Sequence, residues 1–240
     1  MNRVILSAST DETILAVTRQ HKLVDLEIEQ QINTEIVGCI YKGIVKNIVP
    51  AVDGIFVDIG IGKNAFLRRK DLLNEKRFPT EGSPILAQVI KSDTDMKGAL
   101  ITEKISMLGK YAVTLSGTGY IGVSKKIRSE SVRKRLKEIG KEICAEHMGL
   151  IIRTAAENAD MDEFRKDITR LKENWDIIQK RFRMEKSPTL LYRESDIIVK
   201  ALRDYVNKGT EILITDNRKI YERICKLNES EHTIEPDKIS

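Results

Sequence analysis

The first hundred residues divide into short segments of alternating apolar and polar residues, and this pattern most limits what the chain can fold into. Period-two alternation predicts strands that bury one face, and the glycines between them predict turns. Pro50 and Asp53-Gly54 mark one such turn. Five short strands with glycine-bearing turns are typical of a small closed β-barrel such as an OB fold. The predicted barrel segments are 38–52, 54–60, 64–69, 85–91 and 97–103.

Strand patterns also lie before and after these barrel segments. Predicted strands at 189–193 and 211–216 alternate with helices, which predicts a parallel or mixed α/β layer. Such a layer needs more than two strands, so we expect N-terminal strands to complete it and the barrel to be an insertion. The N-terminal strand segments are 4–9, 12–18 and 23–29.

Local residue types predict where the last helices begin. Ser195 is expected to cap one helix, and Asp216 or Asn217 is expected to cap a final helix that runs through Cys225. The polar segment 228–240 shows no closing element, which we interpret as a chain that continues into a longer protein.

The middle of the chain mixes both kinds of element. Residues 111–115 and 149–154 read as strands, and 129–146 reads as a basic helix interrupted by Gly140. A second helix is predicted at 160–183, because its large apolar residues recur at gaps of three and four. This apolar stripe is Met161, Phe164, Ile168, Leu171, Trp175, Ile178 and Phe182.

Composition excludes several classes of protein. With 41% hydrophobic residues the chain can build a core, so it is not a disordered polymer. No apolar run approaches the ~18 residues of a membrane-spanning helix. Cys39, Cys144 and Cys225 form no CxxC pair, so we expect a reducing, cytoplasmic setting rather than disulfides or a zinc ribbon.

Positive charge is concentrated in one part of the sequence. The net charge is +5, yet residues 97–141 hold eleven basic side chains against three acidic ones. Such an excess suits a polyanion, because each neutralised phosphate releases counterions. The alternative interpretation is a solvated helix face.

Two groups of residues have the chemistry to bind RNA. Phe56 and Phe66 lie on consecutive predicted strands, where exposed rings would stack on bases, and Lys97 would pair with a phosphate beside them. The alternative places both rings in the barrel core. Arg153-Thr154 at a strand end offers a guanidinium fork and a hydroxyl that suit a terminal phosphate.

Known catalytic motifs are missing from the sequence. It has no HExxH, GxSxG or Walker-type loop. Asp58 and Asp216 are the nearest metal-ligand candidates, and we interpret them as a turn residue and a helix cap. A nuclease acting through the α/β layer would need Asp216 to combine with acids such as Asp25 and Glu27.

Several segments, in this order, resemble the ribonuclease E/G family of endoribonucleases, over nearly the whole chain. The stretches that carry the resemblance are IYKGIVKNIVPAVDGIFVDIGIGKNAFL (40–67), KGALITEKISMLGKYAV (97–113), IGVSKKI (121–127), MGLIIRTAAE (148–157), ESDIIVKALRDYV (194–206) and EILITD (211–216).

The resemblance implies an α+β multidomain architecture. An RNase H-like α/β layer would comprise 1–34 and 199–240, with an S1-type OB barrel at 35–103 inserted into it. A 5′-sensor α/β domain would occupy 104–198. The RNase H-like layer is structural in this family.

The resemblance also implies which residues bind RNA. Phe56, Phe66 and Lys97 correspond to the barrel residues that hold single-stranded RNA. The pocket that binds a 5′-monophosphate corresponds to Gly109, Val113, Lys125, Arg153 and Thr154. Lys125 departs from the arginine expected there, and lysine keeps the charge but loses the bidentate fork.

The family cleaves RNA with magnesium held in a DNase I-like domain beyond Ser240, and its members form homo-oligomers. This chain itself then needs no cofactor and has no catalytic residue. We therefore expect 240 residues that bind single-stranded, 5′-monophosphorylated RNA for RNA and rRNA processing and decay, without cutting it. The alternative is a non-catalytic RNA-binding adaptor complete at this length.

Overall fold

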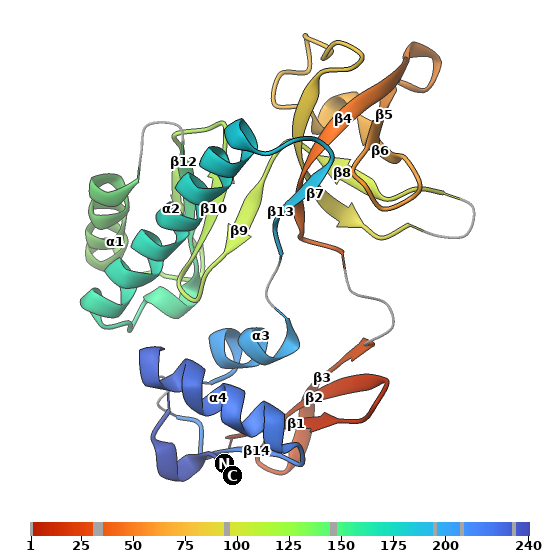
Figure 1. Cartoon of the computed structure of the whole chain (residues 1–240). Helices are drawn as coiled ribbons and strands as arrows, with labels where there is room; N and C mark the ends of the chain where they lie inside the picture. The colour runs from red at the N-terminus through yellow and green to blue at the C-terminus, as the bar shows by residue number, and fades with distance from the viewer. Residues whose placement is uncertain are drawn as a thin grey trace. The chain divides into compact units, whose positions relative to one another are not determined.

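A computed structural model describes residues 2–30, 36–93, 97–144, 148–193, 196–206, 209–231 and 234–240 (Figure 1). The chain divides into two compact units, Met1–Glu35 with Ser195–Ser240, and Ile36–Glu194. The finer domain boundaries at 34, 103 and 198 stay predictions. None of the helices that the structure describes combines the length and the hydropathy of a membrane-crossing segment.

The first unit is a mixed α/β layer, as the sequence pattern predicts. Its sheet has the order β14-β1-β2-β3, in which β1 and β14 are parallel and the other pairs antiparallel. The elements are β1 (Asn2–Ala8), β2 (Glu12–Arg19), β3 (Lys22–Gln30), β14 (Ile212–Thr215), α3 (Ile197–Asp204) and α4 (Arg218–Glu231). One core joins strand residues such as Leu6 and Leu15 to helix residues such as Leu202 and Ile224.

The helix caps differ in part from the predicted ones. Asp196 is the N-cap of α3, because its carboxylate accepts hydrogen bonds from the Ile198 and Val199 amides. The predicted cap, Ser195, lies outside the described residues. At α4 the side chain of Asn217 accepts from the first-turn amides.

The final helix, α4, runs through Cys225, as predicted, to Glu231. One other expectation for the C-terminal segment is wrong. The polar tail does close on the unit: Ile234 and Ile239 are buried in its core, and the Ser240 amide donates to the Leu213 carbonyl over 2.9 Å. Two apolar residues in a polar stretch are enough to anchor it.

The second unit contains the predicted barrel. Its strands are β4 (Ile40–Val49), β5 (Gly54–Asp58), β6 (Ala65–Arg68), β7 (Pro84–Lys91) and β8 (Leu100–Thr102). They follow the order β4-β5-β6-β8-β7, and pairing of β7 with β4 closes the barrel. The predicted turn is a short 3₁₀ segment, Pro50–Val52, followed by Asp53 in the left-handed region with φ 49°. These strands and their closure are those of an OB fold.

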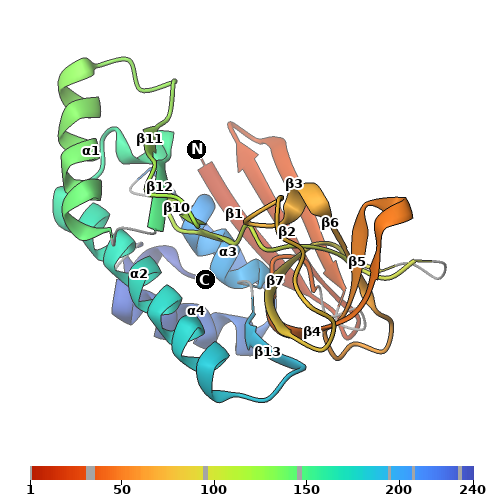
Figure 2. The same ribbon diagram turned by 90° about the horizontal axis from the view of Figure 1, so that it is seen from above.

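The remainder of this unit is a second sheet covered by two helices. Its elements are β9 (Ser106–Leu108), β10 (Ala112–Ser116), β11 (Ile121–Val123), β12 (Met148–Ile152), α1 (Glu130–Ile143) and α2 (Met161–Met184). The strand order is β11-β12-β10-β9, and Figure 2 shows α1 and α2 beside it. A last strand, β13 (Thr189–Tyr192), pairs with β4 of the barrel. Two other short 3₁₀ segments of this unit are Arg69–Asp71 and Thr154–Ala156, and a further one, Pro236–Lys238, belongs to the first unit.

Helix α1 runs without interruption through Gly140, so the predicted break there is wrong. A Cβ at this position would lie 3.1 Å from Leu150 Cδ2 of β12. The glycine therefore lets the helix approach the sheet closely.

The predicted stripe on α2 is confirmed as its buried face. Phe164, Ile168, Leu171 and Ile178 are core residues, and Trp175 packs against them. Asp160 caps this helix by accepting from the amides of Asp162 and Glu163.

Phe164→Ala should lower the free energy of unfolding by about 3–5 kcal/mol, because the fully buried ring leaves a cavity. Ile177→Ala, on the same helix but 54% exposed, should change it by less than about 0.5 kcal/mol. Urea unfolding, followed by the fluorescence of the single tryptophan, Trp175, measures both values. Equal effects would contradict this assignment of the helix faces.

Candidate functional site

Phe56 and Phe66 form a pair of rings on the outer face of the barrel. They are cross-strand partners on β5 and β6, with ring centroids 5.5 Å apart and planes tilted by 51°. Their neighbours along the strands, such as Ile55 and Leu67, are fully buried, so the two rings project away from the core and are half-buried. The alternative that places both rings in the core is wrong.

A glycine supports this aromatic pair. A Cβ at Gly54 would lie 2.3 Å from the Phe66 ring, so the ring lies directly on the Gly54 backbone. On the same strand face, Asp58 pairs with Lys46 over 3.4 Å and accepts from the Gly60 amide. Asp58 is therefore a structural residue beside the rings.

Lys97 lies in the segment that leads into β8. It is exposed, and the Ala99 carbonyl two residues on accepts from the Phe66 amide over 2.7 Å. Gly98 packs so closely on the Asn64 carbonyl that an added Cβ would lie 1.9 Å from it. The segment thus contacts β6 and the residue before it, and Lys97 lies on this segment near the strand that carries Phe66.

A second group of predicted residues meets at one end of the other sheet. Arg153 follows β12, and its Nη1 donates to the Gly109 carbonyl over 2.7 Å and to the Lys110 carbonyl over 3.2 Å. Thr154 is exposed, and its hydroxyl lies 2.9 Å from the Ser124 hydroxyl. Val113 lies on the neighbouring strand β10, opposite Ile151. Gly109, Val113, Arg153 and Thr154 thus share one end of the sheet.

Asp167 on α2 organises this end of the sheet, and sequence reasoning missed it. Its buried carboxylate accepts from the Lys110 amide over 3.1 Å and from the Tyr111 amide over 2.8 Å. A Cβ at Gly109 would lie 2.6 Å from this carboxylate, so glycine is required there. The missed signal was an acid within the apolar stripe, beside Ile168.

Tyr111 provides a second link between this turn and α2. Its hydroxyl donates to Glu163 Oε2 over 2.6 Å. Burial, and then this hydrogen bond to a carboxylate, raises the pKa of Tyr111 above its ordinary value. The phenol therefore stays protonated and keeps donating at neutral pH.

Lys125 is placed differently from the other predicted pocket residues. It is exposed and follows Ser124, whose hydroxyl contacts Thr154. Its side chain lines a groove between β11 and α1 together with Tyr120 and Lys134, and Arg153 is not among the residues of that groove.

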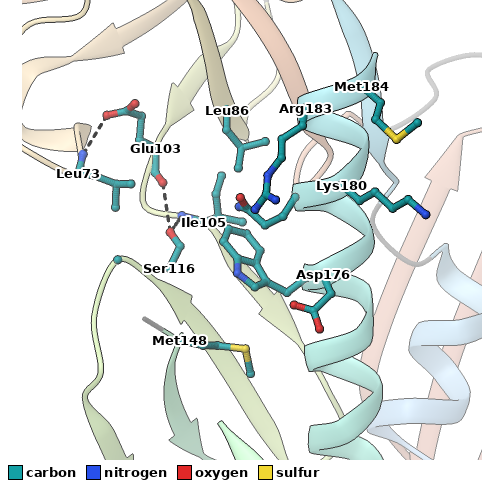
Figure 3. A pocket seen from close by; sticks show the side chains of 13 residues that line it. Leu73, Leu86, Glu103, Ile105, Ser116, Met148, Asp176, Lys180, Arg183 and Met184 are labelled. Carbon is teal, nitrogen blue, oxygen red and sulfur yellow. Dashed lines mark hydrogen bonds between the residues drawn. The ribbon is translucent and has the colours of Figure 1, made fainter. Parts of the chain in front are cut away.

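A larger cavity, of about 770 Å³, lies between β7 and the C-terminal half of α2 (Figure 3). Figure 3 shows Arg183 extending into it from the helix. Burial raises the pKa of Glu103, whose carboxylate accepts from the Leu73 amide. None of the predicted site residues lines this cavity. Its charged lining residues are two acids and two bases, namely Glu103, Asp176, Lys180 and Arg183, so the lining has no excess of either charge.

Three carboxylates of the first unit, those of Asp25, Glu27 and Asp216, accept hydrogen bonds from other groups. Asp216 accepts from the Ser7 hydroxyl over 2.5 Å and from the Ala8 amide, and these hydrogen bonds lower its pKa. Asp25 and Glu27 both accept from the Tyr205 hydroxyl. Within the described ranges, no three His, Cys, Asp or Glu side chains are grouped to hold a metal ion.

A closed five-stranded barrel with a pair of aromatic rings on its outer face is typical of modules that bind single-stranded nucleic acid. Comparison with known proteins agrees: the S1 RNA binding domain matches residues 34–102, and the Ribonuclease E/G family matches residues 106–240. The chain belongs to the ribonuclease E/G family.

Named relatives match most of the chain. It is 32% identical to Ribonuclease G of Escherichia coli (strain K12), with 93% of this chain and 49% of that protein covered. Identity is 32% to Ribonuclease G of Haemophilus influenzae, with 90% of this chain and 47% of that protein covered. The chain is 31% identical to Ribonuclease E of Buchnera aphidicola subsp. Schizaphis graminum, with 92% of this chain and 24% of that protein covered. The chain therefore spans about half the length of the Ribonuclease G relatives.

Asp167→Ala should accelerate amide hydrogen exchange at Lys110 and Tyr111, because both amides lose their acceptor. The free energy of unfolding should fall by about 1–3 kcal/mol, the cost of leaving buried donors unsatisfied. Asp176→Ala, on an exposed part of the same helix, is the matched control. Unchanged exchange at the two amides would refute the role assigned to Asp167.

Proposed function

We propose that this chain is the RNA-binding and 5′-end-sensing part of a single-strand-specific endoribonuclease of RNA processing and decay. The observation that carries the proposal is the outward-facing Phe56–Phe66 pair on an S1-type barrel, in the same compact unit as Arg153 and Thr154. Membership of the ribonuclease E/G family supports it.

The barrel would hold single-stranded RNA without reading its sequence. Two rings 5.5 Å apart on neighbouring strands give bases flat apolar surfaces, and every base has a face that can stack. Lys97, which leaves the barrel close to Phe66, would add attraction to a phosphate.

The end of the second sheet would bind a 5′-monophosphate. The Arg153 guanidinium donates to the carbonyls of Gly109 and Lys110, and these hydrogen bonds fix its orientation. The turn that carries these carbonyls is itself fixed by Asp167, which accepts from the Lys110 amide. A phosphate beside it would take charge-assisted hydrogen bonds from the guanidinium and from the Thr154 hydroxyl. A triphosphate would bring more bulk and charge than these donors can pair.

The cleavage chemistry and the oligomeric state are proposed from the family resemblance. Magnesium-dependent cleavage is assigned, on that resemblance, to the part of the relatives that this chain does not span. Homo-oligomers are proposed on the same ground. The three cysteines, Cys39, Cys144 and Cys225, form no CxxC pair in the sequence, which supports a reducing, cytoplasmic setting.

Phe56→Ala should weaken binding of a single-stranded RNA by about 5- to 100-fold, whatever its 5′ end, because one stacking surface is lost. Phe56→Tyr, which keeps the ring, should bind like the parent protein. Gly54→Ala should also weaken binding, because the new methyl displaces the Phe66 ring. Fluorescence anisotropy with a labelled oligonucleotide measures all three, and unchanged affinity in Phe56→Ala would exclude the barrel platform.

Arg153→Ala should remove the preference for a 5′-monophosphate. The parent protein should bind a 5′-monophosphorylated oligonucleotide about 10-fold or more tightly than its 5′-hydroxyl twin, from charge-assisted hydrogen bonds worth ~1.5–3 kcal/mol. The variant should bind both twins as the parent binds the hydroxyl form. Arg165 pairs with Glu142 on the protein surface, so the control variant Arg165→Ala should keep the preference for a 5′-monophosphate. Equal affinity of the parent protein for both twins would rule out the sensor.

A further inference from the structure

A groove of about 620 Å³ runs between α1 and β11. Strand β11 is an edge strand of its sheet, and it supplies one wall. The lining residues are Tyr120, Ile121, Gly122, Val123 and Lys125 from the strand side, and Glu130, Ser131, Arg133, Lys134 and Lys137 from the helix side. No residue of the Phe56–Phe66 platform belongs to it.

The lining is strongly basic. It has four basic residues against one acidic residue, and the side chain of that acid, Glu130, is 91% exposed. Lys125, Lys134 and Lys137 are exposed, and in the described part of the chain none of them has an ion-pair partner. Three ammonium groups along one groove create a local positive field that selects a polyanion.

Arg133 plays a different part from the lysines. Its guanidinium donates to the carbonyls of Ser124 over 2.7 Å and of Ile127 over 2.9 Å. These bonds fasten the segment after β11 to α1, so the two walls of the groove are fixed to each other. Its shape is therefore already formed without a ligand.

An aromatic ring lies at the end of the groove away from Lys125. Tyr120 is 64% exposed, and its ring lies against the backbone of Gly122. A Cβ at Gly122 would lie 2.8 Å from Tyr120 Cε1, so the glycine makes room for the ring. A ring supported on one side and open to solvent on the other is a stacking platform for a base.

The dimensions suit a chain rather than an isolated phosphate. Because an extended strand rises about 3.3 Å per residue, Tyr120 lies on the order of 10 Å from Val123 at the end of β11. At that end, the Ser124 hydroxyl contacts Thr154. A basic groove of this length with an aromatic ring fits a polyanion that carries bases.

We propose that the α1–β11 groove is a further binding site for single-stranded RNA, which stacks a base on Tyr120 and pairs backbone phosphates with Lys125, Lys134 and Lys137. This proposal rests on the proposed RNA-binding function. It adds a contact with RNA that depends neither on base identity nor on the chemistry of the 5′ end. The site would hold an internal part of a transcript while the barrel holds another.

The salt dependence of binding tests the lysines. With a 5′-hydroxyl oligonucleotide, so that the terminal phosphate plays no part, Lys134→Gln with Lys137→Gln should reduce the slope of log Kd against log salt by about 1.4, from ~0.7 per phosphate contact. The matched control is Arg135→Gln with Lys141→Gln, which removes the same charge from exposed positions of the same helix outside the groove. Equal reductions in both double variants would overturn the proposal.

Substitutions of Tyr120 test the stacking platform. Tyr120→Ala should weaken binding by about 5-fold or more, Tyr120→Phe should not, and Gly122→Ala should weaken it by displacing the ring. Photocrosslinking with 4-thiouridine RNA should place a nucleotide on the peptide that contains Tyr120. Unchanged affinity in Tyr120→Ala, or crosslinks confined to the barrel, would overturn the proposal.

The experiments distinguish a wrong groove proposal from a wrong proposed function. Weaker binding in Phe56→Ala with full binding in all groove variants would leave the barrel as the RNA site and exclude the groove. No binding of single-stranded RNA by the parent protein would refute both. An acidic peptide that binds the protein, loses affinity in the Lys134→Gln, Lys137→Gln variant and leaves RNA binding unchanged would assign the groove to a peptide and overturn the proposal.

Discussion

The buried carboxylate of Asp167 joins helix α2 to the turn between β9 and β10, and the proposed 5′ pocket depends on that contact. The consecutive amides of Lys110 and Tyr111 donate to it. The carboxylate lies so close to the neighbouring Gly109 that a side chain at that position would not fit. The carbonyls of the same turn then orient Arg153. A buried charge is stable only when it is paired and hydrogen-bonded, so this carboxylate and the turn require each other. Arg170, which contacts the carboxylate over 3.1 Å, supplies the opposite charge.

The barrel presents its rings by a simpler principle. Successive side chains on a strand point to opposite faces, so burying Ile55 and Val57 forces Phe56 outward, and burying Leu67 does the same for Phe66. Antiparallel pairing of β5 and β6 then places the rings directly opposite each other. The core that stabilises the barrel thus also creates the platform. Gly54 completes it by letting one ring lie on the backbone.

Charge and aromatic rings recur together on this protein, but by different means. On the barrel, the rings are cross-strand partners and Lys97 comes from a neighbouring segment. In the α1–β11 groove, one ring lies at the end of an edge strand and the lysines come mostly from a helix. The cavity lined by Trp175 shows the contrast, because its acids and bases balance. Aromatic surface and net positive charge must coincide to favour a nucleic acid.

Periodicity in the sequence determined the longer elements: the longer barrel strands, the N-terminal strands and the apolar stripe of α2. Burial of one face needs only a local repeat, which a sequence displays directly. Strands β9 and β11 span three residues each, too few to show a repeat, and they exist because β10 and β12 pair with them. Only the tertiary structure decided that Gly140 lies inside a helix, that Ile234 and Ile239 anchor the tail, and that Asp167 and Tyr120 join the candidate sites. Each of these outcomes depends on a partner distant in sequence, and a local pattern carries no information about such a partner.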